Sequence, residues 1–361
     1  MYPHTQLTTL CRHWCVAAPV SVAPLGMRGF SGSRVFFVEF ADSRGQFVLK
    51  SFHAAASREH ATFVHDLVRH VRSERSTQLA EVIPTLDGDA IATDAEGRLW
   101  ELSRFMPGVA VPCPTPSQAA AAATALARLH VAAASLPGHL PRLHVSPGVE
   151  RRIERSRQLL AQPWTARRDA WSRAARLWMP ADVSAALAAR VAAAIEIFAA
   201  SDGNTFLARV ATRRPNGCLL QPVLRDVWCD HVLFADRAHD AVTAIIDLHA
   251  AGIDTPATDL ARLAGSWDPQ PKDDRRPLIE RWHEAVAAYH RVRPLSREEA
   301  ALIPLLHATG VVFGIDNWFR WTCEQRREFP DTQKMLDRLD RLLASLPGAF
   351  ATAWPAVGNL D

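Results

Sequence analysis

The sequence predicts an α+β fold with two lobes, a small β-rich N-terminal lobe and a larger, mainly helical C-terminal lobe. Three observations support this prediction. Strand signals and one helical segment fill residues 21–105. A Pro-Gly turn follows at 106–108, and beyond it the chain has helical spacing except for a β island at 218–248. We therefore expect the N-terminal lobe to span 1–106 and the C-terminal lobe to span 107–361.

The β-rich lobe starts with a predicted hairpin. Residues 34–40 and 46–50 are rich in β-branched and aromatic side chains, and the Asp-Ser-Arg-Gly segment between them supplies turn residues. A helix follows, because apolar side chains within 59–71 share one face at helical spacing. Glycine-containing turns then mark two more short strands, the last of which is 99–105.

The helical lobe is predicted from alanine-rich and arginine-rich stretches. Alanine-rich helices are expected at 117–135 and 182–200, and helical spacing returns from 257 to 346. The arginine-rich stretch 149–178 should be broken or kinked at Pro163. We interpret its arginines as a solvated helix face and its regularly spaced tryptophans as core. The alternative for the arginines is an anion-binding wall of a substrate pocket.

Composition excludes several classes of protein. Of the 361 residues, 48% are hydrophobic and 22% are charged, which allows a large core and excludes a largely disordered chain. The net charge of +3 is too small to indicate binding to nucleic acid or to an anionic membrane. Among the 41 basic residues only Lys50, Lys272 and Lys334 are lysines. Because lysine is so rare among the basic residues of this chain, we expect a lysine here to be present for the chemistry of its amino group.

The chain shows no targeting or membrane signal. Its first residues lack the basic stretch and apolar run of a signal peptide. The apolar window at 118–136 is interrupted by Arg128 and His130, so we do not expect it to span a membrane. The six cysteines have no zinc-ligand spacing, which favours reduced thiols. We expect a cytoplasmic protein with no membrane or nucleic-acid partner, and the sequence leaves its oligomeric state open.

The most informative residues are Asp226, His231 and Asp247. Asp226 opens a loop, His231 lies five residues later where a strand begins, and Asp247 ends the following strand. Because a hairpin would join these strands, we expect the three side chains to lie close together. A carboxylate that accepts a hydroxyl proton, beside two possible metal ligands, is what phosphoryl transfer requires. A histidine that only hydrogen-bonds the loop is the alternative for His231, and the other histidines, such as His65 and His249, are expected at surface or capping positions.

Three segments resemble the aminoglycoside phosphotransferase and choline-kinase-like group, small-molecule kinases with a bilobal protein-kinase-like fold. The first segment, 224–231, begins with Leu224-Arg225-Asp226 and ends at His231. The second is Ile245-Ile246-Asp247, and the third, 254–262, ends in Asp259-Leu260-Ala261-Arg262. The resemblance implies an ATP-dependent phosphotransferase that uses Mg²⁺ or Mn²⁺ and transfers the γ-phosphate to a hydroxyl group of a small molecule. It also implies that Asp226 is the catalytic base, that Asp247 and His231 are metal ligands, and that Asp259 braces the catalytic loop.

The resemblance also assigns phosphate-binding residues. Gly29, Ser31 and Gly32 match the glycine-rich loop whose backbone covers the phosphates. Lys50 matches the strand lysine that contacts the α- and β-phosphates, with an exposed strand lysine as the alternative.

Two further residues are assigned to the nucleotide site. In this fold the lysine is paired with a carboxylate from the helix, and we choose Glu59, with Asp66 as the alternative. Ser103 lies within 101–105, the segment that corresponds to the hinge strand, which binds adenine through its backbone.

Two positions depart from the group. Leu224 stands where the group has a loop-bracing histidine, and His231 stands where it has a metal-binding asparagine. Mg²⁺ prefers oxygen ligands, whereas imidazole suits softer divalent ions. These departures motivate a second hypothesis, a nucleotide-binding pseudokinase that acts as a regulator or scaffold. The retained Asp226, Asp247 and Lys50 weigh against it. An aminoglycoside resistance enzyme is disfavoured, because a pocket for a polycation should be acidic and this helical lobe is arginine-rich.

Overall fold

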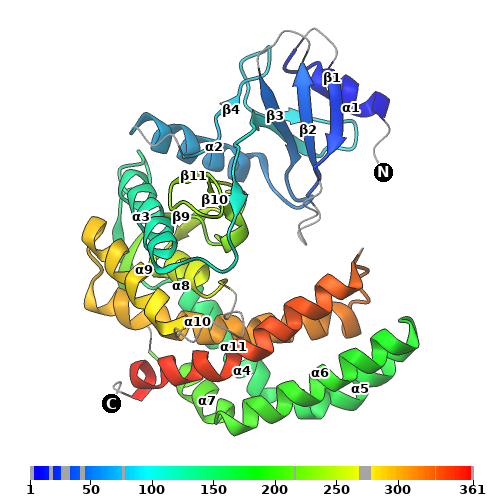
Figure 1. Cartoon of the computed structure of the whole chain (residues 1–361), viewed down its shortest axis with the longest axis vertical. Coiled ribbons are helices and arrows are strands. Elements are labelled where there is room, and N and C mark those ends of the chain that lie inside the picture. The colour runs from blue at the N-terminus through cyan, green and yellow to red at the C-terminus, as the bar shows by residue number, and fades with distance from the viewer. Residues whose placement is uncertain are drawn as a thin grey trace. The chain divides into compact units, whose positions relative to one another are not determined.

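The computed structural model of the chain (Figure 1) divides into two compact units. The first unit contains Met1–Leu140, Gln221–Ile253 and Ala287–Arg293, and the second contains Pro141–Leu220, Asp254–Val286 and Pro294–Asp361. The structure describes residues 4–15, 19–25, 33–40, 45–74, 78–214, 217–267, 278–329 and 331–358.

The first unit is built on an antiparallel sheet. Its strand order is β1-β2-β3-β6-β4, and β5 also pairs with β6. The predicted hairpin is present as β2 and β3. The strands are β1 (Pro19–Pro24), β2 (Val35–Phe40), β3 (Gln46–Ser51), β4 (Val82–Ile83), β5 (Ala92–Thr93) and β6 (Leu99–Arg104).

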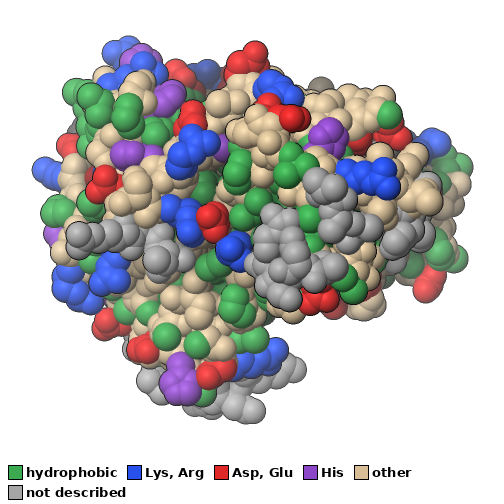
Figure 2. All heavy atoms as spheres, turned by 90° about the horizontal axis from the view of Figure 1, so that it is seen from above, with side chains coloured by type: hydrophobic (Ala, Val, Ile, Leu, Met, Phe, Trp, Pro, Cys, Tyr) green, Lys and Arg blue, Asp and Glu red, His purple; other side chains and the backbone are tan. Residues whose placement is uncertain are grey.

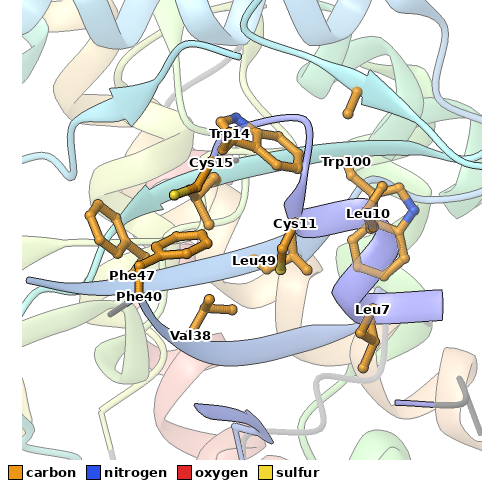
Figure 3. Close-up of a cluster of buried hydrophobic side chains, with 12 residues drawn as sticks. Leu7, Leu10, Cys11, Trp14, Cys15, Val38, Phe40, Phe47, Leu49 and Trp100 are labelled. Atoms are coloured by element: carbon orange, nitrogen blue, oxygen red, sulfur yellow. The ribbon is translucent and has the colours of Figure 1, made fainter. Parts of the chain in front are cut away.

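One face of this sheet is covered by an N-terminal helix, α1 (His4–Cys11), which the sequence analysis did not predict. Figure 3 shows Leu7, Leu10 and Cys11 among the buried side chains of the sheet strands. Trp14 extends this cover, since its indole N–H donates to the carbonyl oxygen of Ile83 at 2.9 Å. The helix thus removes apolar surface of the sheet from water.

The first unit also holds the helices and the small sheet that position the site. Helix α2 (Arg58–Ser73) is capped by Ser57 and packs against α3 (Pro116–Ala133), both close to their predicted ranges. A second sheet has the order β11-β10-β7. Its strands are β7 (Val109–Ala110), β10 (Val232–Phe234) and β11 (Val242–Ile245), and a short 3-10 helix, η1 (Cys229–His231), leads into β10.

The second unit is mainly helical, as predicted. The arginine-rich stretch is broken at Pro163, as predicted, and this proline directly precedes the first residue of a new helix, because its ring cannot continue the preceding one. The helices are α4 (Pro147–Ala161), α5 (Trp164–Arg176), α6 (Ala181–Ala200), α7 (Gly203–Thr212), α8 (Ala257–Ala264), α10 (Arg297–Phe319), the π-helical turn η2 (Arg320–Glu324) and α11 (Thr332–Gly358). Helix α9 (Leu278–Val292) contributes to both units, and the remaining strands are β8 (Arg142–His144), β9 (Cys218–Val223) and β12 (Gly252–Asp254).

Two arginines of the predicted solvated face are used in buried ion pairs instead. Arg155 and Arg167 both contact the carboxylate of Asp316, at 3.1 and 2.7 Å. The indole N–H of Trp164 donates to the same carboxylate at 3.0 Å. A buried carboxylate requires such partners, so this cluster ties α4 and α5 to α10. On the face that Figure 2 shows, basic and acidic side chains are interspersed, in keeping with the small net charge.

Two helical segments of the described chain are long and apolar enough to cross a membrane by length and composition, and 118–136 is not among them. They are α6 and the continuous segment from Arg297 to Glu324, whose most apolar windows are 28% and 67% buried inside the fold. Core helices of soluble proteins pass the same test, and the burial of the second segment is typical of them.

Candidate active site

The predicted hairpin brings the three chemistry-bearing residues together. Strands β10 and β11 pair antiparallel with Val232 opposite Ile245. His231 therefore lies directly before one strand, and Asp247 lies two residues after the other. The backbone N–H of Ile246 donates to the carbonyl oxygen of His231 at 2.8 Å, which holds the two ends side by side.

His231 connects the loop of Asp226 with Asp247. Its Nδ1–H donates to the backbone carbonyl oxygen of Asp226 at 2.9 Å, because a carbonyl can only accept. Its Nε2 lies 3.8 Å from Oδ2 of Asp247. In the neutral imidazole this arrangement leaves the lone pair on Nε2, on the side of the Asp247 carboxylate.

Lys50 at the end of β3 pairs with Asp247. Its Nζ lies 2.6 Å from Oδ1, and the lysine is buried whereas the Asp247 side chain is 41% exposed. Burial by itself raises the pKa of Asp247, but the charge of Lys50 and its hydrogen bond outweigh this effect, so that the pKa lies below its ordinary value. Asp247 is ionised at neutral pH and is the counter-ion of the buried lysine.

Asp226 occupies a half-buried position in the loop that precedes η1. The indole N–H of Trp228 donates to Oδ1 of Asp226 at 2.5 Å, which fixes the orientation of the carboxylate. The preceding Arg225 has a left-handed backbone, with φ of 64°. Its guanidinium donates to the carbonyl oxygen of Ile253 at 2.8 Å and lies so close to Gly252 that a Cβ there would be 2.3 Å away. The loop is therefore anchored to β12, and Gly252 leaves room for the anchor.

The predicted pairing of Lys50 with a carboxylate of α2 is wrong. Glu59 lies exposed in the first turn of α2, where a hydrogen bond from Ser57 and a backbone N–H lower its pKa. Asp66 is exposed and pairs with Arg69 one turn later. Both positions lie outside the buried face of the helix. That face is formed by Ala61, Val64, His65, Leu67, Val68 and Val71.

The carboxylate that lies beside Lys50 comes from β6, and the sequence analysis missed it. Glu101 stands directly opposite Lys50 in the β3–β6 register. It accepts hydrogen bonds from Nε2 of His65 at 2.6 Å and from Nε2 of His249 at 2.8 Å. His65 is therefore buried and His249 half-buried, both as members of a hydrogen-bond network, and the prediction of surface or capping positions was wrong for them. Burial would raise the pKa of Glu101, but its two histidine partners hold it well below the ordinary value.

The remaining residues predicted to bind the nucleotide are those of the glycine-rich loop and Ser103. Gly29, Ser31 and Gly32 lie outside the described residues. Ser103 is in β6, which pairs with β3 on one edge and β4 on the other, and stands opposite Val48 and Val82. The next N–H groups, of Arg104 and Phe105, donate to neighbouring strands. These two N–H groups are therefore engaged within the fold, and a contact of Ser103 with the nucleotide stays a prediction.

Comparison with known proteins identifies the family of this chain. A model of the phosphotransferase enzyme family matches residues 26–295. The chain belongs to this phosphotransferase family. In sequence it is similar to the homoserine kinase of Xanthobacter autotrophicus, with 25% identity over 269 residues that cover 73% of this chain and 70% of the relative. The homoserine kinase of Mesorhizobium japonicum is 26% identical over 280 residues, which cover 77% and 75%.

Solved structures of phosphotransferases have the same fold. An amicoumacin kinase in complex with AMP-PNP, Ca²⁺ and Ami has a TM-score of 0.63 at 13% identity and covers 96% of this chain and 94% of that chain. A spectinomycin phosphotransferase in complex with ADP and spectinomycin has a TM-score of 0.62 at 10% identity and covers 98% of both chains. A microcompartment-associated aminopropanol kinase has a TM-score of 0.56 at 16% identity and covers 99% of both chains.

The predicted fold class is confirmed by these structures, which share the α+β, bilobal, protein-kinase-like fold. The family confirms the predicted class of activity, an ATP-dependent phosphotransferase that acts on a small molecule. Nothing in the comparisons favours the alternative of a pseudokinase.

Proposed function

We propose that this phosphotransferase binds ATP through Lys50 and Asp247 and uses Asp226 to orient and deprotonate a hydroxyl group of the acceptor. The observation that carries the proposal is the position of His231, which hydrogen-bonds the Asp226 backbone on one side and faces the Asp247 carboxylate on the other. Catalysis of phosphoryl transfer is mostly positioning and charge stabilisation, so a fixed spacing of these groups is what the reaction needs.

Asp226 would accept the proton of the attacking hydroxyl as its oxygen approaches the γ-phosphorus. Its carboxylate is oriented by the indole N–H of Trp228, which donates to Oδ1. Lys50 would neutralise phosphate charge from the end of β3. The division into lobes of 1–106 and 107–361 is part of this proposal, since the strands of the large sheet all precede residue 106.

The donor chemistry of His231 and Asp247 fits a divalent cation. Nε2 and Oδ2 lie 3.8 Å apart, and the hydrogen bond at Nδ1 keeps Nε2 unprotonated in the neutral ring. No cluster of three or more metal-ligating side chains occurs in the part of the chain that the structure describes. Phosphate oxygens and water would complete the coordination, as is usual in kinases. When bound, the cation supplies charge neutralisation at the phosphates.

The imidazole ligand favours Mn²⁺ over Mg²⁺, because nitrogen ligands suit softer ions. The solved amicoumacin kinase contains AMP-PNP and Ca²⁺, which supports a nucleotide and a divalent cation here. The homoserine kinases among the sequence relatives make homoserine the first acceptor to test, followed by other hydroxyl-bearing amino acids. We place the enzyme in the cytoplasm, where ATP and such acceptors are available.

The test is phosphotransfer from ATP to an acceptor panel headed by homoserine, with Mn²⁺ and Mg²⁺, for the wild type and for Asp226→Asn. Asparagine keeps the shape of the side chain but does not take up the hydroxyl proton. We expect turnover to fall by about 10²–10⁴-fold with nucleotide affinity nearly unchanged. Asp230→Asn, at an exposed aspartate four residues later, is the matched control. Wild-type turnover in Asp226→Asn would show that the base lies elsewhere.

A further inference from the structure

A buried carboxylate beside the proposed phosphate-binding lysine has no part in the mechanism above. Glu101 and Lys50 are paired across β3 and β6, so their side chains leave the same face of the sheet. Glu101 is 8% exposed, and each of its carboxylate oxygens accepts a hydrogen bond from a different histidine, His65 or His249. A buried carboxylate with both oxygens occupied has one fixed orientation.

These contacts close a ring that contains the proposed active-site residues. Lys50 pairs with Asp247 at 2.6 Å, and Asp247 is followed two residues later by His249. His249 donates to Glu101, which stands opposite Lys50. Phe52 stacks on the imidazole of His249, with ring centroids 3.9 Å apart and planes 7° apart. The position of the segment 247–249 therefore depends on Glu101.

Helix α2 joins the ring through two histidines. His65 donates to Glu101, and Nε2 of His60 donates to the backbone carbonyl oxygen of His249 at 2.8 Å. The helix therefore contacts both the buried carboxylate and the segment that follows Asp247. In this chain histidines supply the link between helix and site for which we expected a helix carboxylate.

We propose that Glu101 is a positioning residue, which holds the segment 247–249 and helix α2 so that Asp247 and Lys50 face the nucleotide and its metal. This inference rests on the proposed function of Asp247 and Lys50. A carboxylate suits the role because it accepts from both histidines at once. The Nδ1 atoms of His65 and His249 are buried without a hydrogen-bond partner, which fits rings that carry their proton on Nε2.

Replacement of Glu101 by glutamine removes half of this acceptor capacity. The amide oxygen accepts from one histidine, but the amide nitrogen donates, so the other ring must move its proton to a buried Nδ1 that has no partner. The attachment of one histidine is therefore weakened, because the ring either loses the contact or keeps it with a buried, unpaired Nδ1–H. If this histidine is His249, the segment that carries Asp247 is held less firmly.

The test compares the wild type with Glu101→Gln by calorimetric titration with ATP and Mn²⁺ and by steady-state kinetics. We expect Kd and KM for ATP to rise by about 10–100-fold, the usual effect of removing a group that orients a metal ligand, with KM for the acceptor unchanged. A merely structural defect would lower the active fraction, and thus kcat, at unchanged KM for ATP. Glu81→Gln is the matched control, because Glu81 pairs with Arg104 of the same strand but at the surface.

A second pair of variants keeps the inference falsifiable if Glu101→Gln does not fold. His249→Gln retains an N–H donor toward Glu101, whereas His249→Leu does not, so the glutamine variant should bind ATP more tightly than the leucine variant. Equal ATP affinity of these two variants, or wild-type KM for ATP in Glu101→Gln, would overturn the positioning role alone. A wild-type protein that binds no nucleotide would overturn the proposed function, and this inference with it.

Discussion

Replacing Asp247 by asparagine should tighten the binding of ATP in the absence of metal. Nζ of Lys50 is 2.6 Å from Oδ1 of Asp247, so a nucleotide phosphate that binds Lys50 must compete with this carboxylate for the lysine. Asparagine removes the competing charge and its repulsion toward the phosphates. It also removes the proposed metal ligand, so the same substitution should abolish the stimulation of ATP binding by Mn²⁺.

The size of the effect follows from the separation of the two charges. At the 2.6 Å of this pair, Coulomb's law gives about 1.6 kcal/mol at an effective dielectric constant of about 80 and about 3 kcal/mol at about 40. The Asp247 side chain is 41% exposed, so solvent screening and the ordering of both side chains reduce this value. We expect about 1 kcal/mol to remain, which corresponds to about fivefold in the metal-free Kd for ATP.

The assay is calorimetric titration with ATP in the presence of EDTA, and then with Mn²⁺. Asp247→Asn should bind metal-free ATP about fivefold more tightly than the wild type. The double variant Lys50→Ala, Asp247→Asn should lose the part of this gain that comes from the released lysine, and should bind metal-free ATP more weakly than Asp247→Asn alone. Asp240→Asn, an exposed aspartate in the turn of the same hairpin, controls for net charge. Equal or weaker metal-free binding by Asp247→Asn would show that Asp247 does not withhold Lys50 from the nucleotide.

Two further predictions concern histidines. His231→Asn exchanges an imidazole for an amide oxygen, so the ratio of ATP affinity with Mn²⁺ to that with Mg²⁺ should fall; an unchanged ratio would make His231 a structural residue. Burial lowers the pKa of His307 to about 4, below its ordinary value, so its contribution to stability is complete above pH ~6.5 and declines as pH falls toward 4. In urea unfolding, the free energy of unfolding of the wild type, relative to that of His307→Phe, should fall between pH 7.5 and 5 by up to about 1.4 kcal/mol per pH unit. If both proteins show the same pH dependence, the lowered pKa of His307 is contradicted.

The residues that the sequence located correctly are those joined by local geometry. Asp226, His231 and Asp247 are separated by a five-residue loop and a short hairpin, so spacing alone brings them together. The strand that ends in Lys50 is likewise defined by its own composition and turn. In these cases the chain has few alternative arrangements.

The carboxylate that stands opposite Lys50 could not be predicted in this way, because strand register and helix rotation decide which carboxylates face the lysine. Glu101 opposes Lys50 only in the observed register of β3 and β6, and a shift by one residue would place it on the other face. The sequence analysis favoured Glu59 because it lies four residues before Phe63 on the amphipathic helix. The rotation that tertiary packing imposes on α2 turns His65 inward and leaves Glu59 in solvent.

Two residues of the site, Arg225 and Asp247, have left-handed backbones, with φ of 64° and 63°. For residues with a Cβ this conformation costs about 1–2 kcal/mol each, whereas glycine adopts it freely. Backbone strain beside the reacting groups therefore lowers the stability of the fold. Glycine at position 225 would relieve the strain but also remove the anchor to Ile253, so selection for thermal resistance alone should enrich glycine only at position 247, while selection for turnover should restore aspartate there. If thermal selection enriches glycine and selection for turnover enriches the natural residue, then strain in the backbone of the site is where this enzyme loses stability in favour of activity.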